Sequence, residues 1–316
     1  MNFIEKHIGG LCAMEQRVLL MVNPMAGRQK IRNELLYVVD TLTKAGYETI
    51  IYTTQGKDAT RDLLAEKDSQ FDRVICCGGD GTFNEILSAT MHWDKRPILG
   101  YIPAGTTNDF AAGLKLPSDI REAAVNIVRG TPHTVDAGLF NTSYFSYVAS
   151  FGAFTETSYS TPQNFKNALG HLAYILEGIK EIPAFTSYTV CVEADGQIYK
   201  DSYIFGAVSN ARSVGGILKI SDSLVDLNDG VFEVMMIKMP KTLMDLSAIV
   251  TSLTSLNPLK YDPSMFLFLQ TKELKITFEQ EMVWSLDGER VSGGKEAKNC
   301  LHQRCIQNIN RIMEAE

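Results

Sequence analysis

The chain has 316 residues and a net charge of -7, with 37 Asp and Glu against 30 Lys and Arg. This length favours two domains with a substantial core, and the acidic balance argues against a general nucleic-acid binder, which normally shows a basic face. No apolar run approaches the length of about 20 residues that spans a bilayer. Residues 1–14 are too mixed for a clear signal peptide, and we interpret them as an extension outside the first domain.

The first half alternates predicted strands and helices. The expected strands are 17–22, 48–54, 73–77 and 97–102, and the expected helices are 31–45, 59–67, 82–91, 110–114 and 118–129. Such alternation implies right-handed crossovers and a mostly parallel, doubly wound sheet, which we assign to residues 15–136. Ligands of such sheets bind outside the carboxyl ends of the strands.

Three glycines follow the third predicted strand, in the segment 77–85 with the sequence CGGDGTFNE. Glycines at a strand-to-helix junction permit a sharp turn and leave N–H groups open to an anion, beside the positive end of a helix. Asp80 would repel a bare phosphate, so a divalent cation between the carboxylate and the phosphate best explains the pair. The segment therefore suggests a metal-bound nucleotide. The alternative is a tight turn in which Asp80 caps the helix.

The second half has a different texture, with period-two and aromatic-rich segments. The expected β segments are 134–140, 144–151, 188–193, 197–208, 231–237 and 273–278, and helical stretches are expected at 162–182 and 243–256. We assign residues 137–299 to a second, β-rich and sandwich-like domain, and expect the tail 300–316 to return to the first. The apolar stripe of the helix at 162–182 is interpreted as core rather than as a ligand pocket.

Two acidic turns in this half could carry chemistry. Asp226 and Asp229 lie three residues apart beside Gly230, so their oxygens could hold Mg²⁺ or Ca²⁺, although a turn of this composition needs no metal. Asp287 precedes Gly288 in what is most simply a hairpin. Facing the cleft between the domains, it would be a general base for an attacking hydroxyl.

Taken together, three ordered motifs resemble the catalytic domain of the diacylglycerol kinase family, which includes sphingosine, ceramide and small bacterial lipid kinases. They are N-P-x-x-G from Asn23, G-G-D-G-T-x-N-E from Gly78 and P-x-G-T-x-N-D from Pro103. The resemblance covers nearly all of residues 15–290, and size makes the chain most similar to the soluble bacterial members. It implies a nucleotide-binding α/β domain and a β-sandwich-like domain with ATP in the cleft between them.

The resemblance also implies roles for individual residues. The implied nucleotide contacts are Asn23, Thr53, Thr54, Gly79, Asp80, Gly81, Thr82, Asn84, Glu85, Gly105, Thr106 and Asp109. Asp80 and Asp109 would share a carboxylate, water and Mg²⁺ network. Asp226, Asp229 and the carbonyl of Val231 would hold a structural Mg²⁺. Asp287 would activate the lipid hydroxyl with support from Glu289.

Some positions depart from the pattern, including Ala26 where a serine is common and a polar segment at 293–310. We expect an ATP- and Mg²⁺-dependent kinase that converts diacylglycerol to phosphatidic acid. The expected protein is cytoplasmic with reduced thiols, binds the cytoplasmic leaflet peripherally through local Lys and Arg, and binds no nucleic acid. The sequence is compatible with a homodimer. The alternatives are a kinase of a sphingoid base or undecaprenol, and a regulator that binds nucleotide or lipid without catalysis.

Overall fold

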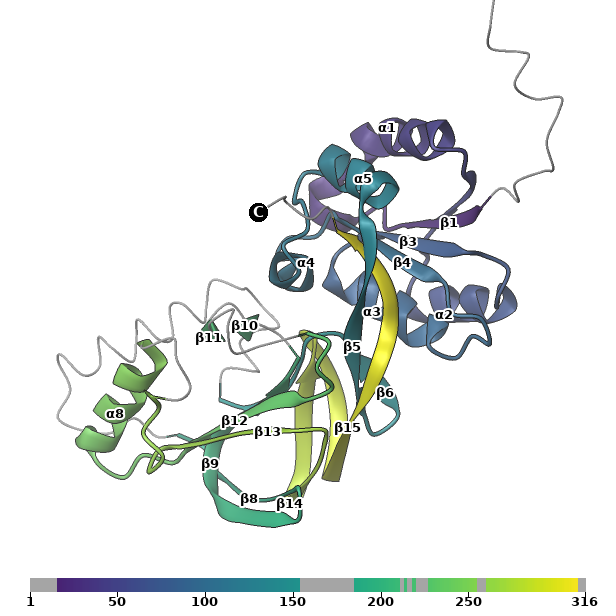
Figure 1. The fold of residues 1–316 in the computed structure, drawn as a ribbon. Helices are drawn as coiled ribbons and strands as arrows, with labels where there is room; N and C mark the ends of the chain where they lie inside the picture. Colours follow the sequence, from purple (N-terminus) through teal and green to yellow (C-terminus); the bar gives the residue numbers. More distant parts are fainter. Residues whose placement is uncertain are drawn as a thin grey trace, which may run out of the picture.

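The structure, a computed structural model, describes residues 16–153, 185–210, 213–214, 218–219, 227–254 and 260–311. The helix expected at 162–182 and the carboxylate of Asp226 lie outside these residues. Within them the chain forms an α/β part and a β-rich part joined by two long strands (Figure 1). The fold class predicted from the sequence is confirmed.

The first part is built on a four-stranded parallel sheet with the order β2-β1-β3-β4. Its strands are β1 (Arg17–Val22), β2 (Glu48–Thr53), β3 (Arg73–Gly78) and β4 (Ile98–Pro103). Between and after them lie η1 (Ala26–Gln29), α1 (Lys30–Lys44), α2 (Lys57–Glu66), α3 (Asp80–Thr90), α4 (Asp109–Gly113) and α5 (Ile120–Arg129). The central strands β1 and β3 are apolar along nearly their whole length because helices cover both faces of the sheet.

Alternate residues of β1 enter different cores. Leu19 and Met21 pack with α2 and α3 on one face, whereas Val18 and Leu20 pack with α1 and α5 on the other. Asp119 fixes the start of α5 because its side chain accepts hydrogen bonds from the N–H groups of the next turn. The sheet is therefore the middle of three layers, and its carboxyl edge carries the loops of interest.

The second part is a nine-stranded antiparallel sheet that curves on itself (Figure 1). Its strands are β5 (Thr131–Phe140), β6 (Ser143–Phe145), β7 (Val148–Gly152), β8 (Tyr188–Ala194), β9 (Gln197–Ser209), β12 (Phe232–Lys238), β13 (Phe266–Thr271), β14 (Glu273–Leu286) and β15 (Glu289–Arg311). The pair β10 (Ser213–Val214) and β11 (Leu218–Lys219) is separate, and α8 (Leu243–Thr254) follows β12. Its concave interior holds a second core that includes Phe151, Val234 and Trp284.

Strands β5 and β15 pair over much of their length and run from one part of the molecule to the other (Figure 1). The end of β15 also contacts β4 and α5 of the first part. The polar texture of 293–310 gave no strand prediction, nor did 266–271, which forms the edge strand β13. The period-two alternation of these two strands is weak, and most of the second half of β15 pairs with β5, which is distant in sequence.

Candidate active site

Three loops interlock at the carboxyl edge of the parallel sheet. The ideal Cβ of an alanine at position 27 would lie 1.9 Å from the carbonyl oxygen of Ala104, and one at position 105 would lie 2.6 Å from the Cα of Gly79. The side-chain amide of Asn23 donates to the hydroxyl of Thr82 at 3.0 Å. Only glycines allow this approach, so the N–H groups of these loops gather at one place without side chains to cover them.

Asp80 ties two of these loops together. Its carboxylate accepts hydrogen bonds from the N–H of Asp109 at 2.9 Å, the N–H of Phe110 at 3.3 Å and the hydroxyl of Tyr101 at 3.2 Å. The side chain therefore satisfies the first N–H groups of α4, and the alternative in which it caps its own helix is wrong: α3 has no side-chain cap.

Asn108 directly precedes the short helix α4, and Asp109 is its first residue. Asn108 occupies the cap position in a left-handed conformation with φ of 53°, but its side chain makes no cap hydrogen bond. Its Oδ1 instead accepts from the N–H of Gly105 at 2.9 Å, and its amide donates to the Gly105 carbonyl at 3.1 Å. Asn108 thus closes the third loop on itself, because the cap role is already taken by Asp80.

The pKa of Asp80 is raised to about 6, mainly by burial and also by the nearby charges of Asp109 and Asp287, against the lowering effect of the hydrogen bonds from the N–H groups of Asp109 and Phe110. Burial also raises the pKa values of Asp109 and Asp287 above their ordinary range. Burial and the charges of Asp109 and Asp287 make ionised Asp80 costly, and a hard cation with oxygen ligands would relieve that cost. The donor set therefore fits Mg²⁺ held by Asp80 and Asp109.

Asp287 comes from the other part of the molecule and is 4% exposed. Its Oδ2 accepts from the side-chain amide of Asn84 at 2.8 Å and from the N–H and the hydroxyl of Ser146 at 2.6 and 2.7 Å. Its Oδ1 accepts from the N–H groups of Tyr147 and Val148, both at 3.0 Å. Five donors meet a group with about four lone-pair directions. A further donor can reach this carboxylate only by replacing one of them.

The position of Asp287 follows from a two-residue hairpin between β14 and β15. Leu286 pairs with Glu289, and the intervening Asp287 and Gly288 have φ of 49° and 88°. Two positive φ values match the type I′ turn that the Asp-Gly pair predicts. The Asp287 N–H also donates to the carbonyl of Val148 at 2.9 Å. This turn carries the carboxylate against α3.

Glu289 reaches over the start of α3 from the same hairpin. Its Oε2 accepts from the ammonium of Lys57 at 2.8 Å, and a Cβ at position 81 would lie 3.2 Å from its Oε1. Glu85 lies nearby: burial raises its pKa, the charge of Lys57 lowers it and that of Glu289 raises it. Lys57 was not found from the sequence, because a lysine at the start of a helix carries no distinguishing signal.

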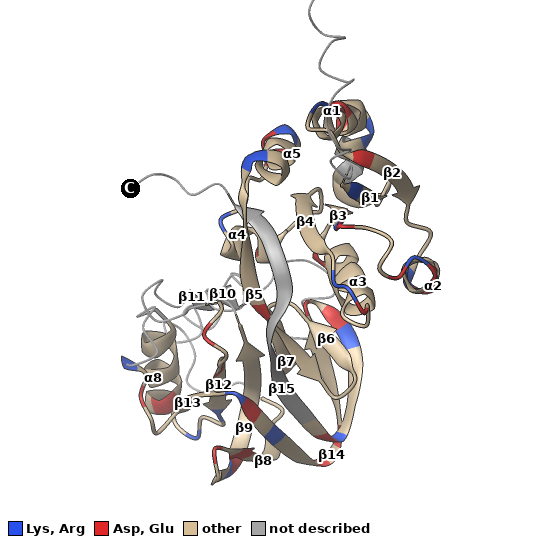
Figure 2. Cartoon of the chain, turned by 45° about the vertical axis from the view of Figure 1, so that its right-hand side comes forward, with Lys and Arg blue, Asp and Glu red and all other residues tan. Residues whose placement is uncertain are grey.

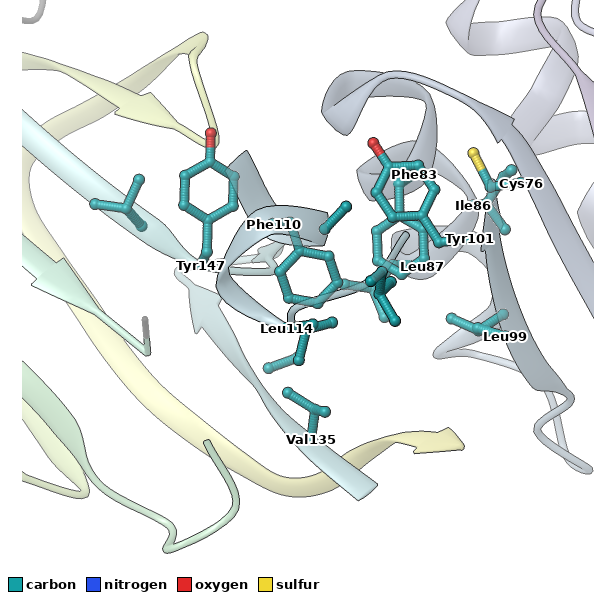
Figure 3. Close-up of a cluster of buried hydrophobic side chains, with 14 of the residues drawn as sticks. Cys76, Phe83, Ile86, Leu87, Leu99, Tyr101, Phe110, Leu114, Val135 and Tyr147 are labelled. Atoms are coloured by element: carbon teal, nitrogen blue, oxygen red, sulfur yellow. The ribbon is translucent and has the colours of Figure 1, made fainter. Parts of the chain in front are cut away.

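A row of packed aromatic rings lies next to the residues that bind the carboxylates. Phe110 lies between Phe83, at 5.0 Å between ring centroids, and Tyr147, at 6.4 Å (Figure 3). Phe83 also packs on Tyr101 at 4.8 Å. The aromatic contacts thus run from α3 through α4 to the β6–β7 connection, and they join Tyr101, which donates to Asp80, to Tyr147, whose N–H donates to Asp287.

The predicted structural metal site is only partly described. Asp229 is exposed and its Oδ1 accepts from the N–H of Val231 at 3.0 Å, as in an ordinary turn, whereas Asp226 lies outside the described residues. In the part of the chain that the structure describes, no three His, Cys, Asp or Glu side chains gather to hold a metal ion. The buried Asp136, missed from the sequence, accepts from the N–H of Gly230 at 2.8 Å and fastens this loop to β5.

The other predicted contacts lie along the same sheet edge. The N–H of Thr54 donates to the carbonyl of Val22 at 2.9 Å, which places the end of β2 beside Asn23. Thr53 and Thr106 are exposed. Among residues not predicted, Tyr101 and Ser146 stand out because they donate to Asp80 and Asp287.

Comparison with known proteins agrees with this arrangement. Residues 17–140 match the family model described as diacylglycerol kinase catalytic domain, and residues 150–302 match the YegS C-terminal NAD kinase beta sandwich-like domain. A diacylglycerol kinase of Bacillus subtilis (strain 168) is 34% identical over 87% of this chain and 90% of that protein. The chain belongs to the diacylglycerol kinase family. It is therefore a lipid kinase, and its fold implies a nucleotide substrate.

Other members of the diacylglycerol kinase family show the same relation. A diacylglycerol kinase of Staphylococcus carnosus (strain TM300) is 32% identical over 92% of this chain and 93% of its own. A crystal structure of a candidate diacylglycerol kinase from Bacillus anthracis str. Sterne superposes with a TM-score of 0.75 and 27% identity, covering 94% of this chain and 95% of that one. The resemblance inferred from the three motifs is confirmed. Within the described residues, every helix is too short or too polar to cross a bilayer.

Proposed function

We propose that this lipid kinase transfers the γ-phosphoryl group of ATP, bound with Mg²⁺, to the hydroxyl of diacylglycerol and so forms phosphatidic acid. The observation that carries the proposal is the convergence of Asp80 and Asp287, from different parts of the molecule, on the first turns of α3. Asp287 accepts from Asn84, one turn beyond Asp80, and its charge raises the pKa of Asp80. Acceptor activation and phosphate binding would thus occur side by side.

In this proposal the interlocked loops bind the phosphates through their N–H groups at the start of α3, where the helix dipole favours negative charge. Asp80 and Asp109 would hold Mg²⁺, which neutralises charge on the phosphates when bound. Lys57 lies next to Glu85 and Glu289 and would keep these two acids from repelling the nucleotide. The chain's contribution is mainly positioning and preorganised charge.

Asp287 is the proposed base, and its hydrogen-bond donors limit how the substrate hydroxyl can approach it. The substrate hydroxyl must replace one of the two side-chain donors, the amide of Asn84 or the hydroxyl of Ser146, before it can give up its proton. The N–H groups on Oδ1 belong to the backbone and would stay. The buried carboxylate, with its raised pKa, is a better proton acceptor than an exposed aspartate.

We further propose that the protein works in the cytoplasm and meets its substrate by binding the cytoplasmic leaflet peripherally, since the acceptor is a membrane lipid. An assay with ATP labelled in the γ position, over vesicles containing diacylglycerol, sphingosine or undecaprenol, tests the function. Label in phosphatidic acid is the expected result. Transfer to another alcohol alone would change the substrate, and binding without transfer to any of them would make the chain a regulator.

A further inference from the structure

A groove of about 470 Å³ lies in the second part of the molecule, where β12 ends before its neighbour does. Lys238, the last residue of β12, pairs with Tyr203 of β9 after a register shift. The residues of β9 before Tyr203 pair with β8 on one side only. On their other side lies the groove, which the first residues of β13 also line. None of its lining residues belongs to the candidate active site. Ser209 lies six positions beyond Tyr203 on β9, about 20 Å along the strand, and pairs with Val148 beside Asp287.

The walls of this groove are mainly aromatic. Tyr199 and Tyr203 line it from β9, Phe266 and Phe268 from β13, and Tyr261 from the connection before β13. The rings of Tyr261 and Phe266 pack at 4.8 Å between centroids. A groove of a few hundred cubic ångströms has the size of a small-molecule site, and this one combines aromatic rings with the charged side chains of Lys200, Asp201 and Lys238.

Charge is concentrated at one place on its rim. Lys238 forms an ion pair with Asp201 at 3.2 Å, and the charge of Lys241 also lowers the pKa of that aspartate. Lys200, which is exposed, lines the same groove. Charged residues of both signs lie on β9 and around α8 (Figure 2), and the lysines nearest Asp201 are Lys238 and Lys241. The neighbouring carboxylate of Asp245 accepts hydrogen bonds from the N–H groups of Lys241 and Thr242.

A buried polar atom in the wall also lacks a partner. Tyr261 is 7% exposed, and its hydroxyl makes no hydrogen bond to any residue that the structure describes. Buried polar groups are almost always paired, so such an exception indicates a water or a ligand atom that completes the site.

We propose that this groove binds an anionic amphiphile with one long alkyl chain. The chain would lie along the aromatic walls, and the anionic head would pair with Lys238 in competition with Asp201. The ligand could be a fatty acid or a single-chain phospholipid, since both present an anion on an alkyl chain. The site is independent of the phosphoryl-transfer proposal, because neither set of residues contributes to the other.

Equilibrium dialysis below the critical micelle concentration tests the proposal with palmitate, hexadecyl phosphate and the neutral palmitamide. None of these carries an alcohol, so the acceptor site has no hydroxyl to recognise. The two anions should bind about tenfold more tightly than palmitamide, and saturating Mg²⁺ and ATP should not displace them. The tighter of the two anions identifies carboxylate or phosphate as the natural head group.

Two variants and a control locate the binding. Lys238→Met keeps the apolar stem and should remove the preference for anions. Tyr199→Ala should weaken all three probes about tenfold, since it removes a wall of the groove. Ile198→Ala changes an exposed neighbour outside the groove and should leave binding unchanged. Anion binding that survives both Lys238→Met and Tyr199→Ala, or no binding by the wild type, would overturn the proposal.

Discussion

The side-chain amide of Asn84 donates a hydrogen bond of 2.8 Å to the carboxylate of Asp287, although 203 residues separate them in the chain. Asn84 lies on α3 beside the glycine loop, and Asp287 lies in the hairpin between β14 and β15. This bond joins the nucleotide side of the proposed site to the acceptor side. Together with the four donors from Ser146, Tyr147 and Val148, it occupies all the acceptor positions of the Asp287 carboxylate before any substrate binds.

We predict that Asp287→Asn abolishes phosphoryl transfer and also lowers the melting temperature. The amide of an asparagine cannot take up the proton of the substrate hydroxyl. Its NH₂ group would also replace one carboxylate oxygen, so that N–H donors of Ser146 or Tyr147 would lose their acceptor, and this should lower the free energy of unfolding by about 1–3 kcal/mol. Radiolabel transfer and thermal unfolding measure the two effects. Ser146→Ala removes one donor and keeps the carboxylate, so it should retain activity. Normal turnover in Asp287→Asn would refute the assignment of the base.

Gly105→Ala should weaken ATP binding at least about tenfold, because its Cβ would lie 2.6 Å from the Cα of Gly79 and force two phosphate loops apart. Gly113→Ala is a matched control, since nothing lies within 4 Å of a Cβ there. That change should leave binding intact and slightly favour α4. Equal affinities in the two variants would show that the contact between the loops is irrelevant to ATP.

The raised pKa of Asp80 predicts a pH dependence of stability. Between pH 3.8, the ordinary pKa of an aspartate, and pH of about 6, Asp80 binds more protons in the folded than in the unfolded protein. The free energy of unfolding should therefore fall as pH rises through this window, by about 3 kcal/mol in total from this group. Relative to Asp80→Asn, wild type should therefore lose unfolding free energy from pH 4 to pH 7. Denaturant unfolding at a series of pH values measures this, and parallel curves would contradict it.

Mg²⁺ should reverse that cost. Because the cation binds the ionised carboxylates, it should raise the melting temperature of the wild type more at pH 7.5 than at pH 5, and the gain should shrink in Asp80→Asn. An equal rise of the melting temperature at both pH values would show that Mg²⁺ does not stabilise the protein by binding ionised Asp80.

Asp136→Asn should loosen the loop that carries Asp229. Its Oδ2 accepts from the N–H of Gly230 at 2.8 Å in a fully buried place, so the change should cost about 1–3 kcal/mol and lower the melting temperature by several degrees. Asp195→Asn, in the exposed turn between β8 and β9, is the control and should change little. Equal melting temperatures would show that Asp136 does not hold the loop.

Much of the first part of the molecule could be predicted because its signals are local. Buried parallel strands are continuous apolar runs, the helices repeat with period 3.6, and the glycines of the phosphate loops sit directly after the strands. The Asp-Gly hairpin at Asp287 was likewise readable, since that pair selects its turn type.

The partners of the carboxylates could not be predicted in this way. Ser146 and Tyr101 are ordinary residues in sequence, and their roles depend on which backbone groups long-range pairing brings beside Asp287 and Asp80. The same holds for Asp136, whose burial under Gly230 joins segments 94 residues apart. The strand β15 was missed because its polar residues are stabilised by pairing with β5 rather than by an apolar pattern.

We expect both parts of the molecule to contact one bound ATP at the same time. Iron-promoted affinity cleavage tests it most directly, with Fe²⁺ replacing Mg²⁺ on ATP and the cut sites mapped by mass spectrometry. We expect ATP-dependent cuts near both Asp80 and Asp287. Cuts confined to the loops around Asp80, with none near Asp287, would contradict it.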